Sequence, residues 1–436
     1  MKNLFKPRIT KFLKRTMCLV LAAFVLIPAI SYSMPNGFAS AKAAGSYETV
    51  GVGKKLVDCF PGQSMALAKY VYNTILGKSD WDNNGITYSL TDLDVDTIGN
   101  ITSISICLEN LKADDLDGIQ NFYKLEALSI PNNNLISLPD LSKTKITTLN
   151  CSCNQLTKIP RLPDCLESLD ISCNNILDDI NNNLPSSLLY LQAHDNQLTS
   201  IKGLPIHLRF LDVSKNKLTQ ISDKLPNDIK IFDCSDNNLI AISDLPNELT
   251  YFDCSNNRLS NIPNLPINLT YLDASKNQLI EIPELPNQLT YLDIHENLLR
   301  SLPETLPSSI SYLYCNNNQL NKLPDLLPSS LNYLDLAYNQ LTELPELPES
   351  LTLLSCPYNK LASIPEHLPS RLVCFDVHNN MLTKLPDNLP NSIIVIYCSD
   401  NQLSHLPNPL PKKLRYLYIH NNPNLDFIPK PPKVKP

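Results

Sequence analysis

The chain has 436 residues, of which 43% are hydrophobic and 18% are charged, and its 36 Lys and Arg face 43 Asp and Glu. Seven of the basic residues lie within residues 1–43, which hold no acidic residue, so the remainder of the chain carries a net charge of −14. This acidic balance argues against nucleic acid or an anionic membrane as the partner and favours a basic protein.

Residues 1–43 have the pattern of a cleaved export signal. Basic residues run from Lys2 to Arg15, an apolar run follows from Cys18 to Ile30, and the small residues of Ala39–Ala43 fit a cleavage site. The alternative is a membrane anchor, but an apolar run of 13 residues is shorter than the roughly 20 that span a bilayer. We therefore expect an exported protein whose mature chain has no transmembrane segment.

Residues 44–100 do not repeat and are predicted to form a small helical N-terminal cap. The stretch Ser64–Leu76 places its apolar residues mainly on one face of a helix, with Ser64 as the N-cap and Gly77 as the stop. A stack of repeats exposes leucines at its end, and a cap of this kind covers them.

One unit recurs from residue 101 to about residue 428 with a spacing of 20–22 residues, as in LTYLDASKNQLIEIPELP at Leu269–Pro286. Its pattern is LxxLxLxxNxL followed by a tail with two prolines. Fifteen units carry the asparagine, from Asn133 to Asn422, and a degenerate unit has Glu109 in its place, which makes about 16 units. The pattern predicts a leucine-rich repeat solenoid, and the basic, proline-rich residues 429–436 are expected to form a tail.

Each part of the unit has a predicted structural role. The LxxLxL segment is expected to form a short strand that pairs in parallel with the strands of neighbouring units, giving a concave sheet. The asparagine is expected to bind backbone groups where the chain turns away from the strand. Two prolines per unit predict a return leg that is extended or polyproline-like, because proline removes a backbone donor and fixes φ.

The cysteines suggest core packing rather than a disulfide framework. Six of them fall at the inward third apolar position of their unit, namely Cys151, Cys234, Cys254, Cys315, Cys356 and Cys398. Only adjacent units, about 4.8 Å apart, could be bridged, so the candidate disulfides are Cys153–Cys173 and Cys234–Cys254. No C-x₂-C pair occurs, and the four histidines at the seventh position of the unit, which are His194, His295, His378 and His420, lie two to five units apart, so no metal site or cofactor is predicted.

Two outward strand positions are the candidate protein-binding residues. The tyrosine file occupies the third position of the unit and comprises Tyr190, Phe210, Tyr251, Tyr271, Tyr291, Tyr312 and Tyr333. The aspartate file occupies the fifth position and comprises Asp212, Asp233, Asp253, Asp273, Asp293 and Asp335. Both files are expected on the concave face, where rigid aromatic rings are favoured anchors and a strongly negative stripe would attract a basic partner.

Two other interpretations of the files stay open. Repeats arise by duplication, so the files could be inherited together with their strands, and tyrosine is in any case a good strand residue. Aspartates on neighbouring strands could also share Ca²⁺, which prefers oxygen ligands, and without a cation their mutual repulsion would raise their pKa values.

The chain also resembles two groups of bacterial repeat proteins. FPGQSMALAKYV (Phe60–Val71), LGKSD, LTDLDVDTIGNITSISI and LDGIQNFYKLEALSI (Leu116–Ile130) look like the cap and first repeats of internalin-type surface proteins of Gram-positive bacteria. From Leu162 onward the units are similar to the short repeats of IpaH- and YopM-type secreted effectors. The resemblance implies a cap fused to the repeat stack and a concave face that binds a host or surface protein.

The departures from both groups shape the predicted function. Cys234-Ser235-Asp236 and Cys398-Ser399-Asp400 match the Cys-x-Asp motif of the IpaH ubiquitin ligases, but both cysteines are expected to point inward, and we expect no catalytic domain beside the repeats. No LPxTG wall-anchor signal with its apolar tail is found. We expect a secreted or loosely surface-associated, monomeric binding protein and not an enzyme; the alternatives are a ligase-related effector without a catalytic domain and a structural protein without a partner.

Overall fold

The computed structural model describes residues 122–177, 180, 184–221 and 224–425. Before residue 122 it describes residues 70–71, 73, 76–77, 97–98, 100–105, 116 and 118–119. The predicted export signal, most of the predicted cap and the predicted tail lie outside the described residues and stay predictions. No helix among the described residues has the length and apolar character needed to cross a membrane.

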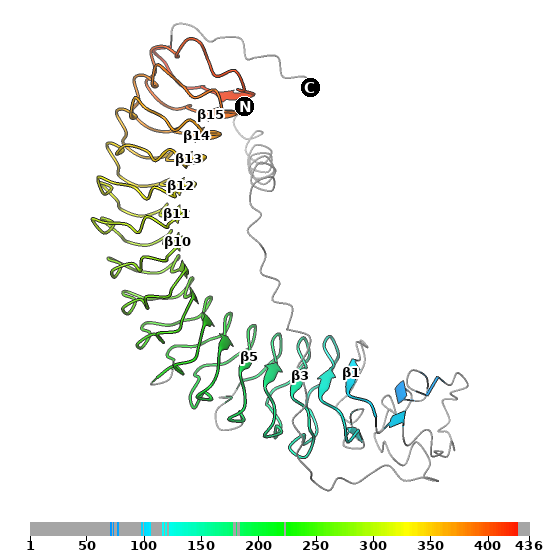
Figure 1. Ribbon diagram of the computed structural model, residues 1–436. Coiled ribbons are helices and arrows are strands. Elements are labelled where there is room, and N and C mark those ends of the chain that lie inside the picture. The colour runs from blue at the N-terminus through cyan, green and yellow to red at the C-terminus, as the bar shows by residue number, and fades with distance from the viewer. Residues whose placement is uncertain are drawn as a thin grey trace, which may run out of the picture. The chain divides into compact units, whose positions relative to one another are not determined.

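The repeats form one parallel sheet in which the spatial order of the strands is their order in the chain (Figure 1). Each strand has three residues, and the sixteen strands are β1 (Ser103–Ser105), β2 (Ala127–Ser129), β3 (Thr148–Asn150), β4 (Ser168–Asp170), β5 (Tyr190–Gln192), β6 (Phe210–Asp212), β7 (Ile231–Asp233), β8 (Tyr251–Asp253), β9 (Tyr271–Asp273), β10 (Tyr291–Asp293), β11 (Tyr312–Tyr314), β12 (Tyr333–Asp335), β13 (Leu353–Ser355), β14 (Cys374–Asp376), β15 (Val395–Tyr397) and β16 (Tyr416–Tyr418). This confirms the predicted leucine-rich repeat solenoid.

Alternation along each strand decides which side chains reach the core. In β9 the middle residue, Leu272, is fully buried, whereas Tyr271 and Asp273 on either side of it are half-buried on the sheet surface. The leucine that precedes the strand, Leu269, and the small residue that follows it, Ala274, are also fully buried. Because each unit contributes the same positions, stacking produces one continuous core along the repeats.

The repeat asparagines bind the backbone of two units, as predicted. The Nδ2 group of Asn277 donates to the carbonyls of Ala274 and Ser275 in its own unit and to that of Cys254 in the preceding unit, at 3.0–3.2 Å. Its Oδ1 atom accepts from the backbone N–H of Leu259, also in the preceding unit, at 3.0 Å. All four bonds are made by buried atoms, so the side chain connects neighbouring units.

The residue before each asparagine has a left-handed backbone, and we call these fifteen residues the turn file. Their φ values lie between 50° and 57°, and the residues are Asn132, Cys153, Cys173, Asp195, Lys215, Asp236, Asn256, Lys276, Glu296, Asn317, Tyr338, Tyr358, Asn379, Asp400 and Asn421. Asparagine and aspartate tolerate this conformation better than other non-glycine residues. The turn file therefore follows the end of the strands along one rim of the sheet.

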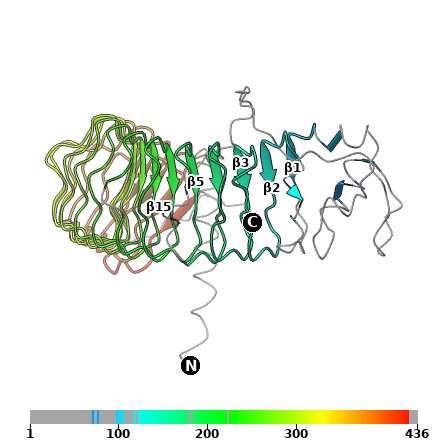
Figure 2. The same ribbon diagram turned by 90° about the horizontal axis from the view of Figure 1, so that it is seen from below.

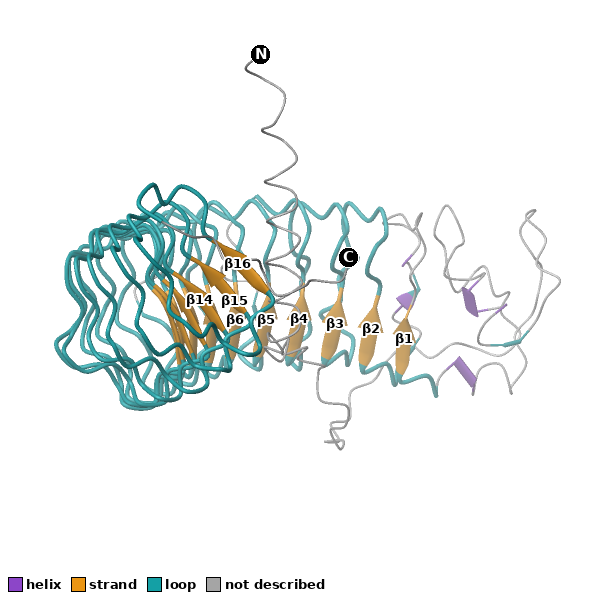
Figure 3. Cartoon of the chain, turned by 90° about the horizontal axis from the view of Figure 1, so that it is seen from above, coloured by secondary structure: helices purple, strands orange, loops and turns teal. Residues whose placement is uncertain are grey.

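The return legs are extended, as the prolines predicted. None of the described residues between 122 and 425 is helical, and Figure 3 shows irregular chain throughout the side opposite the strands. The second proline of the tail starts a tight turn into the next strand, for example where the N–H of Leu269 donates to the carbonyl of Pro266 at 3.1 Å. The view in Figure 2 shows the strands side by side along the stack.

Little of the predicted cap is described. Tyr70, Val71 and Asn73 are helical, and Val71 is completely buried. These residues lie within the stretch that was predicted to form a helix, Ser64–Leu76, whose other residues are mostly outside the described part of the chain.

Candidate binding face

The strand register brings the seven residues of the tyrosine file together on consecutive strands. From β5 to β12 the paired residues are Tyr190, Phe210, Ile231, Tyr251, Tyr271, Tyr291, Tyr312 and Tyr333. Ile231 interrupts the aromatic run between Phe210 and Tyr251. The face therefore has a longer aromatic segment on β8–β12 and a shorter one on β5–β6.

The longer segment is a continuous path of five rings. The rings of Tyr251, Tyr271 and Tyr291 are stacked, with centroids 4.3 Å apart at each step and interplanar angles of 8–9°. The path then continues through Tyr314, whose centroid lies 5.6 Å from that of Tyr291 and 4.6 Å from that of Tyr333. Because stacking covers the ring faces, the face presents mainly ring edges and hydroxyls, while Tyr312 beside the path is 37% exposed.

Tyr314 was predicted to lie on the concave face but was not among the candidate binding residues. It occupies the fifth position of its unit, where most units have aspartate, and its register partners are Asp293 and Asp335. The substitution is visible in the sequence, but its effect depends on the ring leaning toward the neighbouring file, which the repeat pattern alone does not specify.

The aspartates have a local structural role that the sequence analysis missed. Asp253 accepts from both the backbone N–H and the hydroxyl of Ser255, at 2.9 and 2.7 Å. The same pair of hydrogen bonds joins the serine two residues later to the carboxylates of Asp170, Asp212, Asp233 and Asp273. Each carboxylate thus holds the turn that follows its strand, as short polar side chains commonly do. The signal in the sequence is the recurring Asp-x-Ser.

The aspartate file is less negative at neutral pH than the sequence suggested. Burial is the main cause that raises the pKa of Asp253 to about 8, and the carboxylates of Asp273 and Asp233 on the adjacent strands contribute to the same shift. Burial and neighbouring carboxylates likewise raise the pKa values of Asp233 and Asp273 to about 6. The serine bonds oppose this shift only in part, so these three carboxyl groups keep their protons to a higher pH than exposed aspartates would.

The distances give little support to a shared Ca²⁺ in the aspartate file. Among the described residues, the one group of three metal-type side chains whose ligand atoms lie within 4.8 Å of one another is Cys173, His194 and Asp195, on the turn rim. No metal site was predicted from the repeat pattern, in which the four histidines at the seventh position lie in separate units. Comparing the turn-file residues of adjacent units would have brought the cysteine and the aspartate together.

A second aromatic group lies on the turn rim and was also missed. Tyr338 and Tyr358 of the turn file stack with centroids 4.2 Å apart, and Tyr358 contacts the ring of His378 edge to face at 5.1 Å. Tyr338 is 50% exposed and Tyr358 is 41% exposed, more than the stacked tyrosines of the sheet. We call these two tyrosines the rim pair.

The cysteines of both candidate disulfides are free thiols in this structure. Cys234 and Cys254 are completely buried, and the Cys234 thiol donates to the carbonyl of Asp253 at 3.5 Å, so it is held by the backbone rather than by its neighbour. Cys398, in the second Cys-x-Asp sequence, is also completely buried. Burial raises the pKa values of Cys234 and Cys398, as expected for inert core thiols and not for nucleophiles.

Comparison with known proteins agrees with this architecture. The leucine-rich repeat family model matches residues 330–351. YopM from Yersinia enterocolitica is 33% identical, with a TM-score of 0.65, and the match covers 68% of this chain and 64% of that protein. YopM from Yersinia pestis, described as a leucine-rich effector protein, is 35% identical, with a TM-score of 0.59, and the match covers 68% of this chain and 84% of that protein.

Two further proteins are similar to this chain. The functional domain of the internalin InlJ from Listeria monocytogenes, described as including a cysteine ladder, has 24% identity and a TM-score of 0.58 over 77% of this chain and 78% of its own. A leucine-rich repeat protein of Acanthamoeba polyphaga mimivirus is 33% identical over 143 residues. The chain matches 34% of the length of that viral protein.

Proposed function

Because the chain is a bacterial-type leucine-rich repeat protein related to YopM and the internalins, we propose that it binds another protein through the concave face of β5–β12. The observation that carries the proposal is the path of five tyrosine rings on β8–β12. A stacked ring has already lost most of its conformational freedom, so contact with a partner costs little additional entropy, and tyrosine is frequent at the centres of interfaces.

The carboxylates beside the rings favour a partner that brings cationic side chains. A lysine or arginine placed near Asp253 would favour the ionised form of this carboxylate and release its proton. The partner would thereby relieve the repulsion within the aspartate file. We therefore propose a protein with a basic contact surface, of host or surface origin, bound by a monomeric and exported chain.

The proposal is tested by capturing proteins from host-cell and bacterial-surface extracts with the mature chain. The informative variant changes Tyr251, Tyr271, Tyr291 and Tyr312 together to Ser, and a matched variant changes the rim pair, Tyr338 and Tyr358, to Ser. A partner held by the parent should be lost from the first variant and retained by the second. Circular dichroism establishes that both variants remain folded before capture is compared.

Two outcomes would contradict a binding site on the sheet face. Capture that is lost only with the rim pair would move the site to the turn rim. A folded parent chain that captures nothing from any extract would favour the alternative in which the files are inherited and the stack has a structural role without a dedicated partner.

A further inference from the structure

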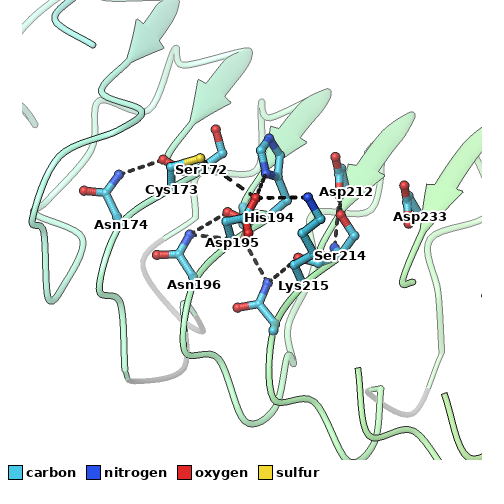
Figure 4. A network of polar contacts seen from close by, with 12 residues as sticks. Ser172, Cys173, Asn174, His194, Asp195, Asn196, Asp212, Ser214, Lys215 and Asp233 are labelled. Atoms are coloured by element: carbon cyan, nitrogen blue, oxygen red, sulfur yellow. Dashed lines mark hydrogen bonds and ion pairs between the residues drawn. The ribbon is translucent and has the colours of Figure 1, made fainter. Parts of the chain in front are cut away.

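Three adjacent units place metal-binding side chains at one point of the turn rim, outside the proposed protein-binding face. Cys173 Sγ, a ring nitrogen of His194 and a carboxylate oxygen of Asp195 all lie within 4.8 Å of one another. The Cys173 thiol approaches Asp195 Oδ2 at 3.9 Å, and His194 Nδ1 lies 3.0 Å from the same oxygen. Figure 4 shows the three side chains pointing toward one another.

A second thiol neighbours Cys173 but lies outside this group of three. Cys153 is the turn-file residue of the preceding unit; burial, and next the interaction with the Cys153 side chain, raises the pKa of Cys173 to about 11. Cys153 is exposed and Cys173 is partly exposed, unlike the completely buried cysteines of the core. Solvent ions can therefore reach both thiols.

The backbone holds these side chains in register. The N–H of Cys153 donates to the carbonyl of Ser172, and the N–H of Cys173 donates to the carbonyl of His194, both at 2.9 Å. The turn-file residues Cys153, Cys173 and Asp195 have φ values of 52–53°, so their side chains leave the rim in the same direction. The site is thus built by the repeat itself rather than by a flexible loop.

Cysteine is an unusual choice at this position. Thirteen of the fifteen turn-file residues are Asn, Asp, Lys, Glu or Tyr, and the two cysteines occur in adjacent units. A β-carbon in the left-handed region costs free energy, which only Asn and Asp offset readily. The two neighbouring cysteines place two thiols side by side along the rim.

We propose that Cys153, Cys173, His194 and Asp195 form a zinc site that links three consecutive repeats. Two sulfurs, one imidazole nitrogen and one carboxylate oxygen are the donors that Zn²⁺ accepts in tetrahedral sites. Bonds of about 2.0–2.3 Å at tetrahedral angles bring ligand atoms to separations of about 3.3–3.8 Å. Cys173, His194 and Asp195 therefore need only small side-chain movements, whereas the Cys153 thiol, which lies outside this group of three, must turn toward them from the preceding unit. Binding releases the thiol protons to solvent.

Lys215 is the cation nearest the site. Its Nζ atom lies 3.6 Å from Asp195 Oδ2, and 58% of its side chain is exposed. An exposed lysine can turn away into water at little cost, so it leaves the carboxylate accessible to a metal ion.

The test uses the full chain, reduced and free of metal, with Co²⁺ alone as the first probe. One equivalent of Co²⁺ should produce visible d–d bands and a near-ultraviolet thiolate-to-cobalt band, and one equivalent of Zn²⁺ should abolish both. Cys173→Ser should weaken binding by more than the roughly 10–100-fold that follows loss of an outer partner of a ligand. Cys153→Ser should reduce the thiolate band and weaken binding.

Cys165→Ser is the matched control, because Cys165 is an exposed cysteine outside the cluster. It should leave the spectrum and the affinity unchanged. His194→Asn provides an independent test that retains both thiols, and it should weaken binding even if Cys173→Ser impairs folding. The proposal is overturned if the parent gives no thiolate-to-cobalt band or if His194→Asn binds Co²⁺ as the parent does. It is also overturned if Cys153 and Cys173 form a disulfide that resists the reducing agent.

Discussion

At the scale of the residue, the asparagine of each unit contributes more than any other polar side chain to the stack. Asn277 donates to three carbonyls and accepts from one N–H, and two of these four partners belong to the preceding unit. Each of the three carbonyls also accepts from one other donor. Without the side chain the buried N–H of Leu259 would lose the acceptor that Asn277 provides, and a buried group left unpaired costs about 1–3 kcal/mol.

We expect Asn277→Ala to lower the free energy of unfolding by about 2–5 kcal/mol, since it removes all four hydrogen bonds of the side chain at a buried site. Denaturant unfolding followed by circular dichroism measures the loss. Gln278→Ala is the matched control, because Gln278 is exposed and adjacent in the chain, and it should cost less than about 0.5 kcal/mol. Equal losses in the two variants would contradict the role of the asparagine.

At the scale of the element, each strand carries two outward residues, and each of them interacts with the residues at the same position of the neighbouring strands. Asp253 on β8 lies in register between Asp233 and Asp273, so its carboxylate is crowded by like charges on both sides. Its raised pKa means that the folded chain binds more protons than the unfolded chain between about pH 4 and pH 8. Stability from this group is therefore present below pH 4 and is lost as the pH rises to 8.

We expect Asp253→Asn to remove this dependence while keeping the turn. Asn150 already occupies the same position in β3 and accepts from the N–H and hydroxyl of Ser152 at 3.0 and 2.7 Å. The variant should match the parent below pH 4 and be more stable by on the order of 1–3 kcal/mol at pH 8. Unfolding free energies measured across this range provide the test. Asp244→Asn, on an exposed return leg, is the control, and a constant difference between Asp253→Asn and the parent would contradict the prediction.

The tyrosine file allows a similar comparison between strands. Tyr271 on β9 is stacked on both sides at 4.3 Å, so Tyr271→Ala should lower the unfolding free energy by about 1–3 kcal/mol through lost stacking and burial. Tyr416 on β16 is 39% exposed, and Tyr416→Ala should cost less. Thermal and denaturant unfolding of both variants measures the difference. If the two losses were equal, the stacked rings would not stabilise the sheet.

At the scale of the whole molecule, the sequence predicts those features that depend only on a residue's position within the repeat. The parallel strand order, the inward leucines, the asparagine bonds and the membership of the two files all depend on repeat position, so counting residues was sufficient. Contacts between different positions were not predictable in this way. Tyr314 leans from the fifth position onto Tyr291 and Tyr333, and His194 reaches the turn-file residues Cys173 and Asp195. These contacts depend on side-chain direction, which the period leaves open.

The turn file separates the shape of the molecule from its surface chemistry. The neighbouring asparagine fixes the backbone of the turn, and the side chain of the turn-file residue contributes nothing to the core. A cysteine, a lysine, an aspartate or a tyrosine is therefore accommodated at successive steps with φ held between 50° and 57°. A single substitution can consequently change what one rim of the solenoid recognises at a chosen distance along its length, without repacking any leucine. The rim offers fifteen evenly spaced, independently variable positions, which makes it a natural surface for grafting new binding groups.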